Sequence, residues 1–401
     1  MKRFAYVLVS FMLVFMLSGC YDSREIERTG AVIAMGIDKG DLMKYRVSFH
    51  IQKHTAQSSG GSDKGGELPK NQALMTVEAP TVADALRQAN EIISVDLNVS
   101  TNKMIIISED IAKEGMYGPL YEIISSPQLN YNSYIAVAKG KAMDVMKNVN
   151  PAEENYLSVY YELILYNLHE DHTKYFFSDD VYFNLESYVK QDVVLPLVGV
   201  NNNDITGYFR DDTSSDLLAG EVPRKSTNKA EFLGGAVFKG DKMIGYLTES
   251  EMAAYSMLYG TFRTRDFTVE YPKGSGKYVV INLNQEEKPA IKTTIENGKI
   301  KENFDLKLTG VYELKDPSKH FTEFNEAYTE YFKSEIKRMC LDLLNKSSRE
   351  WHSDIFSTGK RLRKCFTTWH EYEDYNYMSK FPETEYSVNV EVRFRRNGRF
   401  S

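Results

Sequence analysis

The stretch "KHFTEFNEAYTEYFKSEIKRMCLDLLNKS", residues 319–347, decides the fold class of the C-terminal half of this sequence. Its apolar side chains recur at helical spacing and form one stripe along a long predicted helix. The members of the stripe are Phe324, Ala327, Tyr328, Tyr331, Phe332, Ile336, Cys340, Leu343 and Leu344. A helix with one continuous apolar face needs a broad apolar surface to cover it, so we expect this helix to pack across a β-sheet.

The segments on either side of the helix supply the strands of that sheet. Residues 231–248, "EFLGGAVFKGDKMIGYLT", predict a β-hairpin with Gly240 and Asp241 at its turn. A helix over 250–260 follows and is closed by Gly260. Further strands are expected at 266–271, 277–284, 289–296, 302–314 and 385–396, with a possible helix at 353–366. Strands grouped with one long helix predict an α+β fold, here a C-terminal antiparallel sheet packed with that helix.

The N-terminal half shows a different pattern, in which helices and strands alternate. Strands are expected at 30–38, 45–52, 103–108, 134–140 and 193–200, and helices at 81–94, 110–125, 141–148 and within 151–191. Thr81 and Asp84 resemble a capping box at the start of the first helix. The Gly/Ser-rich segment 54–71 predicts a loop. We therefore expect a multidomain chain whose N-terminal region is mixed α/β.

The first twenty residues indicate export and attachment. Lys2 and Arg3 precede fourteen residues, 4–17, that are apolar except for one serine. As a helix this run reaches roughly 21 Å, short of a ~30 Å hydrocarbon core, so it is typical of a signal peptide rather than a spanning helix. No later apolar run approaches 18 residues, and we expect the mature chain not to cross a membrane.

The sequence "LSGC" at 17–20 resembles the lipobox of bacterial lipoproteins. In that class the cysteine thiol receives a diacylglycerol, the chain is cut just before the cysteine, and the new amine is often acylated. The resemblance implies that Cys20 is the first mature residue, an S-diacylglycerol and N-acyl cysteine that anchors the chain to a membrane. The alternative is an ordinary secretory signal with an incidental cysteine.

Composition limits the partners. The formal charge is −7, and removing Lys2 and Arg3 makes the mature chain more negative. An anionic bilayer repels such a chain, so the lipid has to supply the attachment. Nucleic acid is excluded as a partner because no basic stripe with interleaved aromatics occurs.

Cys340 and Cys365 could form a disulfide, but Cys340 lies on the apolar helix face, which favours a buried free thiol.

No set of residues points to catalysis, a metal or a cofactor. His169 and His172 could share a helix face, but no third ligand is identifiable, and a solvated helix end is the better interpretation. The spacing from Gly235 to Gly240-Asp241-Lys242 lacks the Gly-Lys-Ser/Thr of a phosphate loop and falls inside a hairpin. The 27 tyrosines leave open a carbohydrate or peptide surface, although half-buried packing explains them better.

Four blocks, in order along the chain, carry a resemblance to a known family. They are "LSGCYDSREIERTGAVIAMGIDK" (17–39), "APTVADALRQANEIISVDLNVSTNKMIIISEDIAKEG" (79–115), "GGAVFKGDKMIGYLTESEMAAYSMLYG" (234–260) and "DIFSTGKRLRK" (354–364). Together they resemble the Ger(x)C spore-germination lipoproteins, the C subunits of nutrient germinant receptors. Three departures are visible: Tyr21 stands where the family usually has Trp, Ser357-Thr358 replaces Gly-Phe, and "STNK" (100–103) lacks a histidine often found there.

The resemblance implies a signal peptide at 1–19, an N-terminal Ger(x)C domain at 20–200, a linker at 201–228 and a C-terminal Ger(x)C domain at 229–401. It also implies a non-enzymatic subunit on the outer face of the spore inner membrane, working with an A subunit and an integral-membrane B subunit to trigger germination by nutrients. Whether this subunit contacts the nutrient stays open. The alternatives are a solute-binding lipoprotein of an importer and, more remotely, a cell-envelope hydrolase.

Overall fold

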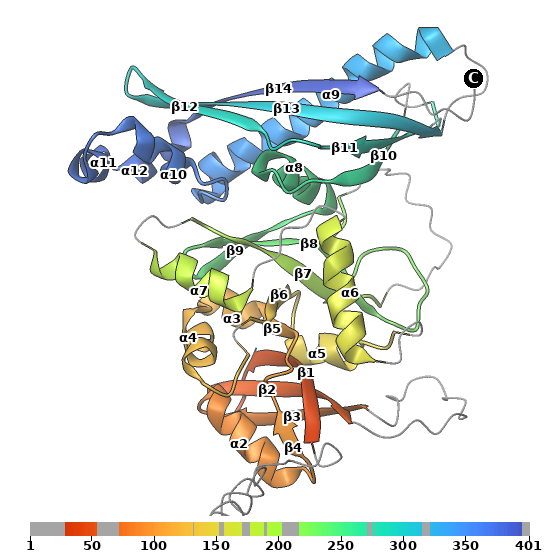
Figure 1. The fold of residues 1–401 in the computed structure, drawn as a ribbon, viewed down its shortest axis with the longest axis vertical. Coiled ribbons are helices and arrows are strands. Elements are labelled where there is room, and N and C mark those ends of the chain that lie inside the picture. The colour runs from red at the N-terminus through yellow and green to blue at the C-terminus, as the bar shows by residue number, and fades with distance from the viewer. Residues whose placement is uncertain are drawn as a thin grey trace, which may run out of the picture.

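The computed structural model describes residues 29–53, 72–130, 132–151, 156–170, 177–187, 191–202, 216–270, 275–276, 278–314 and 321–394. They form two sheets stacked along the long axis of the molecule, with the N-terminal sheet below and the C-terminal sheet above (Figure 1). The architecture confirms the predicted α+β class, with a mixed α/β region followed by a sheet packed with one long helix.

The N-terminal sheet has nine strands. Eight follow the order β3 (Gln72–Ala79), β2 (Tyr45–Lys53), β1 (Thr29–Lys39), β5 (Met104–Ser108), β6 (Tyr134–Ala138), β7 (Val194–Val200), β8 (Ala230–Lys239) and β9 (Lys242–Leu247), and the ninth, β4 (Asp96–Asn98), pairs with β1. The four central strands from β1 to β7 are parallel, and antiparallel strands flank them on both sides. The hairpin predicted at 231–248 is present, but its assignment to the C-terminal sheet was wrong: β8 pairs with β7, so the hairpin extends the N-terminal sheet beyond the expected linker region.

Helices cover both faces of the N-terminal sheet, as expected for central parallel strands that are buried on two sides. One face carries α2 (Val82–Ile92), α3 (Glu109–Glu114), α4 (Tyr117–Ser125) and α7 (Ser178–Glu186), and the other carries α5 (Ala142–Lys147) and α6 (Leu157–Glu170). Thr81 caps α2 as predicted, since its hydroxyl accepts the backbone N–H of Asp84.

Two details of this half differ from the sequence-based expectation. The helix expected over 110–125 is two helices, because the chain breaks at Gly115, whose φ of 139° no L-residue adopts easily. The strands β3 and β4 were not predicted. The expected loop at 54–71 lies outside the described residues.

The C-terminal sheet has five strands. They are β10 (Thr264–Glu270), β11 (Tyr278–Asn284), β12 (Ala290–Glu296), β13 (Lys299–Leu314) and β14 (Glu385–Phe394). The long strand β13 pairs antiparallel with β11 along one part and with β12 along another, while β14 pairs with it in parallel. The sheet is therefore antiparallel apart from β14. Because β14 returns only after α9 and the helices that follow it, a parallel register is topologically accessible.

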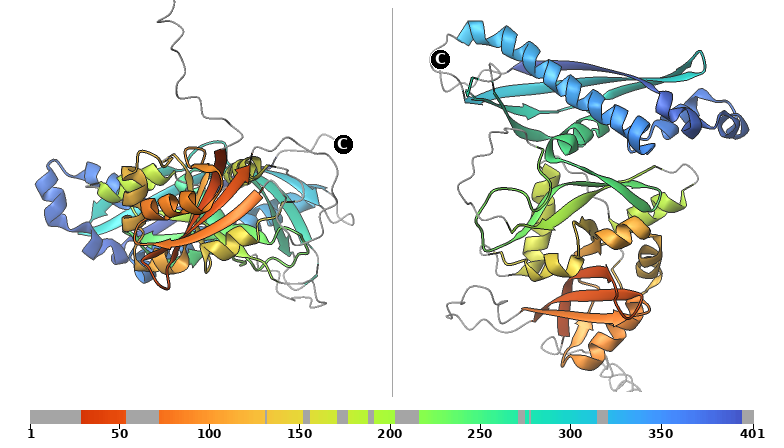
Figure 2. Two further views of the ribbon diagram at one scale, coloured as in Figure 1. Left: turned by 90° about the horizontal axis from the view of Figure 1, so that it is seen from below. Right: turned by 180° about the vertical axis from the view of Figure 1, so that it is seen from behind.

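The long helix α9 (Phe321–Asn345) crosses this sheet diagonally (Figure 2). The predicted stripe faces the core: Tyr328, Phe332, Ile336, Cys340, Leu343 and Leu344 are buried. The side chains of Phe324 and Ala327 lie outside the described residues. The helix runs on into a π-helical turn, Lys346–Trp351, and short helices follow: α10 (Thr358–Leu362), α11 (Trp369–Tyr375) and α12 (Tyr377–Lys380).

One apolar core joins the two sheets. It combines Val194, Val237 and Leu247 of the N-terminal sheet with the C-terminal sheet, α9 and α8 (Glu249–Tyr259). The helix α8 begins with a capping box at Thr248 and ends at Gly260 with φ 82°, as predicted. Since this core is continuous, the two halves pack as one body, and the polar groups at their junction are enclosed.

Candidate functional site at the junction of the two sheets

The structure describes only some of the residues that the sequence suggested for membrane attachment or metal binding. Cys20 and His172 lie outside the described residues, and of His169 the backbone alone is described, within α6. Across the part of the chain that is described, no three His, Cys, Asp or Glu side chains are arranged to hold a metal ion. Gly240 lies in the turn between β8 and β9 with φ 61°, which confirms the hairpin.

The two C-terminal cysteines are both free thiols. Cys340 is buried on the inner face of α9, and burial raises its pKa to about 12. Cys365 is exposed. The apolar setting of Cys340 that the helical stripe indicated is therefore present in the structure.

The first block of the family resemblance contains Asp38, the next-to-last residue of β1, which is 1% exposed. Its carboxylate accepts the backbone N–H groups of Ala142 at 2.7 Å and Met143 at 2.9 Å, the first two residues of α5. Burial raises the pKa of Asp38, and the two N–H groups act against that rise. The N-cap residue of α5, Lys141, supplies no side-chain cap, so Asp38 caps this helix from a distant strand.

The second block contains Asn102, which is 2% exposed just before β5. Its side-chain amide donates to the Ser133 hydroxyl at 2.9 Å, and its backbone carbonyl accepts from the Ser133 hydroxyl and from the Asn130 side-chain amide. These bonds fasten the turn before β5 to the turn before β6. Both blocks thus hold distant segments in register.

The fourth block begins at Asp354, the centre of the candidate site. Its carboxylate oxygens accept the backbone N–H groups of Thr358 and Gly359, each at 2.8 Å, at the start of α10. Its own backbone N–H donates to Oδ2 of Asp192 at 2.9 Å. The other oxygen of Asp192 accepts the backbone N–H of Gly240 at 2.7 Å. Asp192 therefore links the β8–β9 turn and the entry to β7 with the segment that follows α9.

A buried ion pair extends this network into the C-terminal sheet. Glu302 on β13 has a fully buried side chain, and its carboxylate accepts from the Arg361 guanidinium at 2.8 Å. The hydroxyls of Thr293 and Thr358 also donate to it, at 2.7 and 3.0 Å. A buried carboxylate needs this many donors to offset its loss of water.

Burial dominates the electrostatics of the cluster. It raises the pKa of Asp354 to about 6, aided by the nearby Glu302 charge, while the N–H groups of Gly359 and Thr358 and the Arg361 charge act in the opposite direction. The pKa of Tyr377, whose hydroxyl lies 3.4 Å from Asp354, is also raised by burial. The junction therefore holds ionisable groups where water cannot solvate them.

The backbone of the fourth block is shaped for close packing. Ser357 has φ 64°, in the left-handed region that favours glycine. A Cβ on Gly359 would lie 2.6 Å from the ring of Tyr377. The side chain of Phe356 packs edge-to-face on Phe304, with the ring centroids 6.4 Å apart. These constraints hold Asp354 and α10 against β13.

Of the expected linker at 201–228 the structure describes residues 201–202 and 216–228, and both parts are hydrogen-bonded to β8. Glu231, 8% exposed, accepts the backbone N–H groups of Gly220 and Val222 and the Nε–H of Arg224. Sequence reasoning overlooked Glu231, Asp192 and Glu302 as partners. Glu231 and Glu302 lie within strands and Asp192 just before one, and no local signal in the sequence marks them as buried acceptors.

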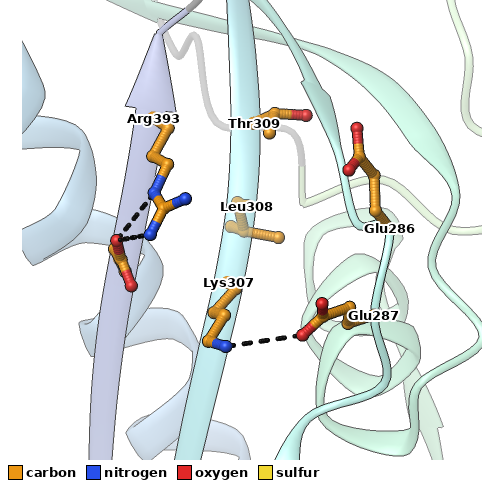
Figure 3. A pocket seen from close by; sticks show the side chains of 7 residues that line it. Glu286, Glu287, Lys307, Leu308, Thr309 and Arg393 are labelled. Atoms are coloured by element: carbon orange, nitrogen blue, oxygen red, sulfur yellow. Dashed lines mark hydrogen bonds and ion pairs between the residues drawn. The ribbon is translucent and has the colours of Figure 1, made fainter.

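A small pocket lies on the outer face of the C-terminal sheet (Figure 3). Its volume is about 90 Å³, well below the roughly 300–1,000 Å³ of typical small-molecule sites. Lys307 forms an ion pair with Glu287 at 3.4 Å, and Arg393 forms one with Glu391 at 2.8 Å. These charged side chains of the pocket lining are therefore paired with one another. It does not present convergent polar groups to a nutrient.

Asp192 accepts donors from both halves of the chain, the backbone N–H groups of Gly240 and Asp354, whereas the donors to Asp354 and Glu302 come from the C-terminal half. Within the described residues, no helix is long and apolar enough to span a bilayer.

Comparisons with known proteins agree with this organisation. The model of the spore germination protein N-terminal domain matches residues 22–200, and that of the spore germination B3/GerAC-like C-terminal domain matches 233–398. "Putative spore germination protein YfkR" of Bacillus subtilis is 24% identical over 91% of this chain and 85% of its own length. "Spore germination protein B3" of the same organism is 20% identical over 98% of both chains. A crystal structure of the GerBC protein has a TM-score of 0.55 at 15% identity, covering 90% of this chain and 96% of that one.

Proposed function

The chain belongs to the Ger(x)C family of spore germination proteins, and on that premise we propose that it is the lipid-anchored C subunit of a spore nutrient germinant receptor. The observation that carries the proposal is the match of both family domains, in order, over nearly the whole chain. The role is non-catalytic: the subunit couples an integral-membrane B subunit and an A subunit, and so helps nutrients to trigger germination.

The proposed anchor is Cys20, modified as an S-diacylglycerol and N-acyl cysteine. The N-terminal family domain begins at residue 22, directly after it. Thr29, the start of β1, is the ninth residue after Cys20, which limits the reach of this tether to roughly 30 Å at about 3.3–3.6 Å per residue. The strands β1 and β4 lie at the end of the molecule opposite the C-terminal sheet (Figure 1). Lipid on Cys20 would therefore put the N-terminal sheet next to the outer face of the spore inner membrane.

The junction network supports a coupling role. Asp192, Asp354 and Glu302 join the two sheets through buried hydrogen bonds. A displacement of one sheet by a partner would therefore carry the other sheet with it. We propose that the subunit works as a rigid coupling element between the membrane and its partners.

The experiment is nutrient-triggered germination of spores that lack this chain, scored against a panel of amino acids, sugars and nucleosides. We expect a selective loss for one nutrient class, with germination by non-nutrient triggers intact. Equal germination across the panel would contradict the proposal. The runner-up, a solute-binding importer lipoprotein, predicts instead direct nutrient binding by the purified chain and loss of uptake, with germination unchanged.

A further inference from the structure

The helix α6 (Leu157–Glu170) has apolar side chains on two opposite faces. Its inner face packs Leu157, Tyr160 and Tyr161 against the N-terminal sheet, and all three are buried. From Tyr156 to Tyr166 the sequence is "YLSVYYELILY", in which Glu162 is the one charged residue. A helix on the surface of a globular protein normally turns a polar face to water, and a helix that is apolar all round is normally buried.

The outer face of α6 is a stripe of four exposed apolar side chains, which we call the α6 stripe: Tyr156, Val159, Leu163 and Tyr166. Their exposed fractions are 48%, 38%, 43% and 58%. Tyr156 belongs to the first turn, because its carbonyl accepts the backbone N–H of Tyr160. The spacing of three, four and three residues places all four on one side for three helical turns. That is the seam spacing with which one α-helix packs against another.

Charge around the stripe discriminates between a bilayer and a protein. Helices that lie in a membrane interface carry Lys or Arg on their polar side. The segment from Tyr156 to Glu170 contains neither, and it contains two glutamates. Glu162, on the edge of the stripe, pairs with Lys103 at 3.2 Å and keeps 61% of its side chain exposed. The Glu162–Lys103 pair is neutral as a unit, so this edge lacks the excess of cations that would attract an anionic lipid surface. Lys or Arg beside the apolar seam of a partner helix can instead bind the exposed part of the Glu162 carboxylate.

The segment Tyr156–Glu170 lacks Lys and Arg, so the same helix of a second copy would bring no cation to Glu162. Area further limits the complexes that the stripe can form. Four half-exposed side chains offer a few hundred Å², whereas a stable complex between free proteins buries about 800 Å² on each side. The stripe is therefore too small to dimerise the chain from solution. It suffices for a partner held in the same membrane, because co-localisation raises the effective concentration without any new contact.

We propose that the α6 stripe is the docking site for an amphipathic α-helix of a membrane-held partner protein, one whose apolar seam is flanked by Lys or Arg. This inference rests on the proposed function, since the shared membrane provides the concentration that the small area requires. It adds to that function the surface through which the subunit meets its partner.

The chain offers a matched control on the other side of the N-terminal sheet. Phe183 on α7 is 62% exposed, more than Leu163, and α7 packs on the face opposite α6. A photo-crosslinking residue is placed at position 163 or at position 183 of the full-length chain in spores. We expect an adduct with another subunit of the receptor, identified by its peptides, from position 163 and none from position 183. An adduct between two copies of this chain, an adduct with lipid, or no adduct at position 163 would overturn the docking site.

A functional variant provides an independent measure. Leu163→Glu places a carboxylate in the seam, and we expect roughly a tenfold lower rate of nutrient-triggered germination, equivalent to about 1.4 kcal/mol of lost docking. The chain should stay in the membrane fraction in normal amount, and Phe183→Glu should germinate within twofold of wild type. Thermal unfolding of both purified variants checks that each folds. If Leu163→Glu does not fold, the crosslink from position 163 alone decides whether the α6 stripe is a docking site.

Spores that lack the chain distinguish a failure of the proposed receptor function from a failure of the α6 docking site. A null strain that germinates normally would contradict the proposed receptor function. A germination-defective null strain combined with a fully active Leu163→Glu variant would contradict the α6 docking site alone.

Discussion

The backbone N–H of Asp354 donates a hydrogen bond to Oδ2 of Asp192, 2.9 Å away, across the junction of the two sheets. The same carboxylate accepts the backbone N–H of Gly240 through its other oxygen. One side chain thus satisfies two backbone donors from segments that are far apart in sequence. Both donors lie outside the helices and strands, so the carboxylate supplies the acceptors that regular secondary structure does not.

Asp192→Ala should destabilise the chain by about 2–4 kcal/mol, because it leaves two buried N–H groups without acceptors. The measurement is the free energy of unfolding in urea. Asp110→Ala is the control: Asp110 lies exposed on α3, and its loss should change that free energy by about 0.5 kcal/mol or less. Equal effects of the two substitutions would contradict the role assigned to Asp192.

Asp354 predicts a specific dependence of stability on pH. Its pKa is about 6 in the folded chain against 3.8 ordinarily, so the folded state binds this proton more tightly than the unfolded state does. Its contribution to stability is therefore greatest below pH 4 and falls by about 3 kcal/mol as the pH rises to 6 and above. Asp354→Asn does not titrate.

The quantity to measure is the difference in unfolding free energy between Asp354→Asn and wild type from pH 4 to pH 8. In this difference the titration of the other carboxylates cancels. Between pH 4 and pH 6 we expect the unfolding free energy of the variant to rise relative to that of wild type. Above pH 6 the difference between the two should stay constant. A difference that is constant over the whole range would show that the environment does not raise the pKa of Asp354.

Arg361→Met should be strongly destabilising, by about 3–5 kcal/mol, because it leaves the buried Glu302 carboxylate without its cation. The double variant Glu302→Gln/Arg361→Met should recover a large part of that loss, since the buried charge is gone. Unfolding free energies of the two single variants and the double variant give the coupling between the two sites. If the free-energy change of the double variant equals the sum of those of the two single variants, Glu302 and Arg361 do not interact.

Ser357→Gly should stabilise the chain by about 1 kcal/mol, because Ser357 occupies the left-handed region with φ 64° and glycine does so without strain. The control is Ser334→Gly in the regular part of α9, where glycine should destabilise by a similar amount. Thermal unfolding should therefore show a gain of stability for Ser357→Gly and a loss for Ser334→Gly. A loss at both positions would contradict backbone strain at Ser357.

Local patterns in the sequence predict much of this fold. The α9 stripe, the Thr81 cap and the Gly260 stop depend on neighbours within a few residues, and the structure confirms all three. Gly115, by contrast, splits a segment whose periodicity is otherwise helical, and periodicity does not register a positive φ. The pairing of β14 with β13 is also beyond local patterns, since it joins segments about 80 residues apart.

The candidate site is harder to predict for the same reason. The block around Asp354 is visible in the sequence, but its partners Asp192 and Glu302 lie 162 and more than 50 residues away. Nothing in their local sequence distinguishes a buried acceptor from a solvated carboxylate. Topology decides it, because β7 and β13 bring both residues to the junction.

Membrane attachment through Cys20 remains the feature on which the proposed receptor role most depends. The most direct measurement compares spores that carry wild-type chain with spores that carry Cys20→Ala in matched amount, scoring the membrane fraction and the rate of nutrient-triggered germination. We predict that Cys20→Ala leaves the membrane fraction and that germination by the cognate nutrient falls, while non-nutrient triggers still act. Full membrane retention with normal nutrient germination would contradict a lipid-anchored receptor subunit.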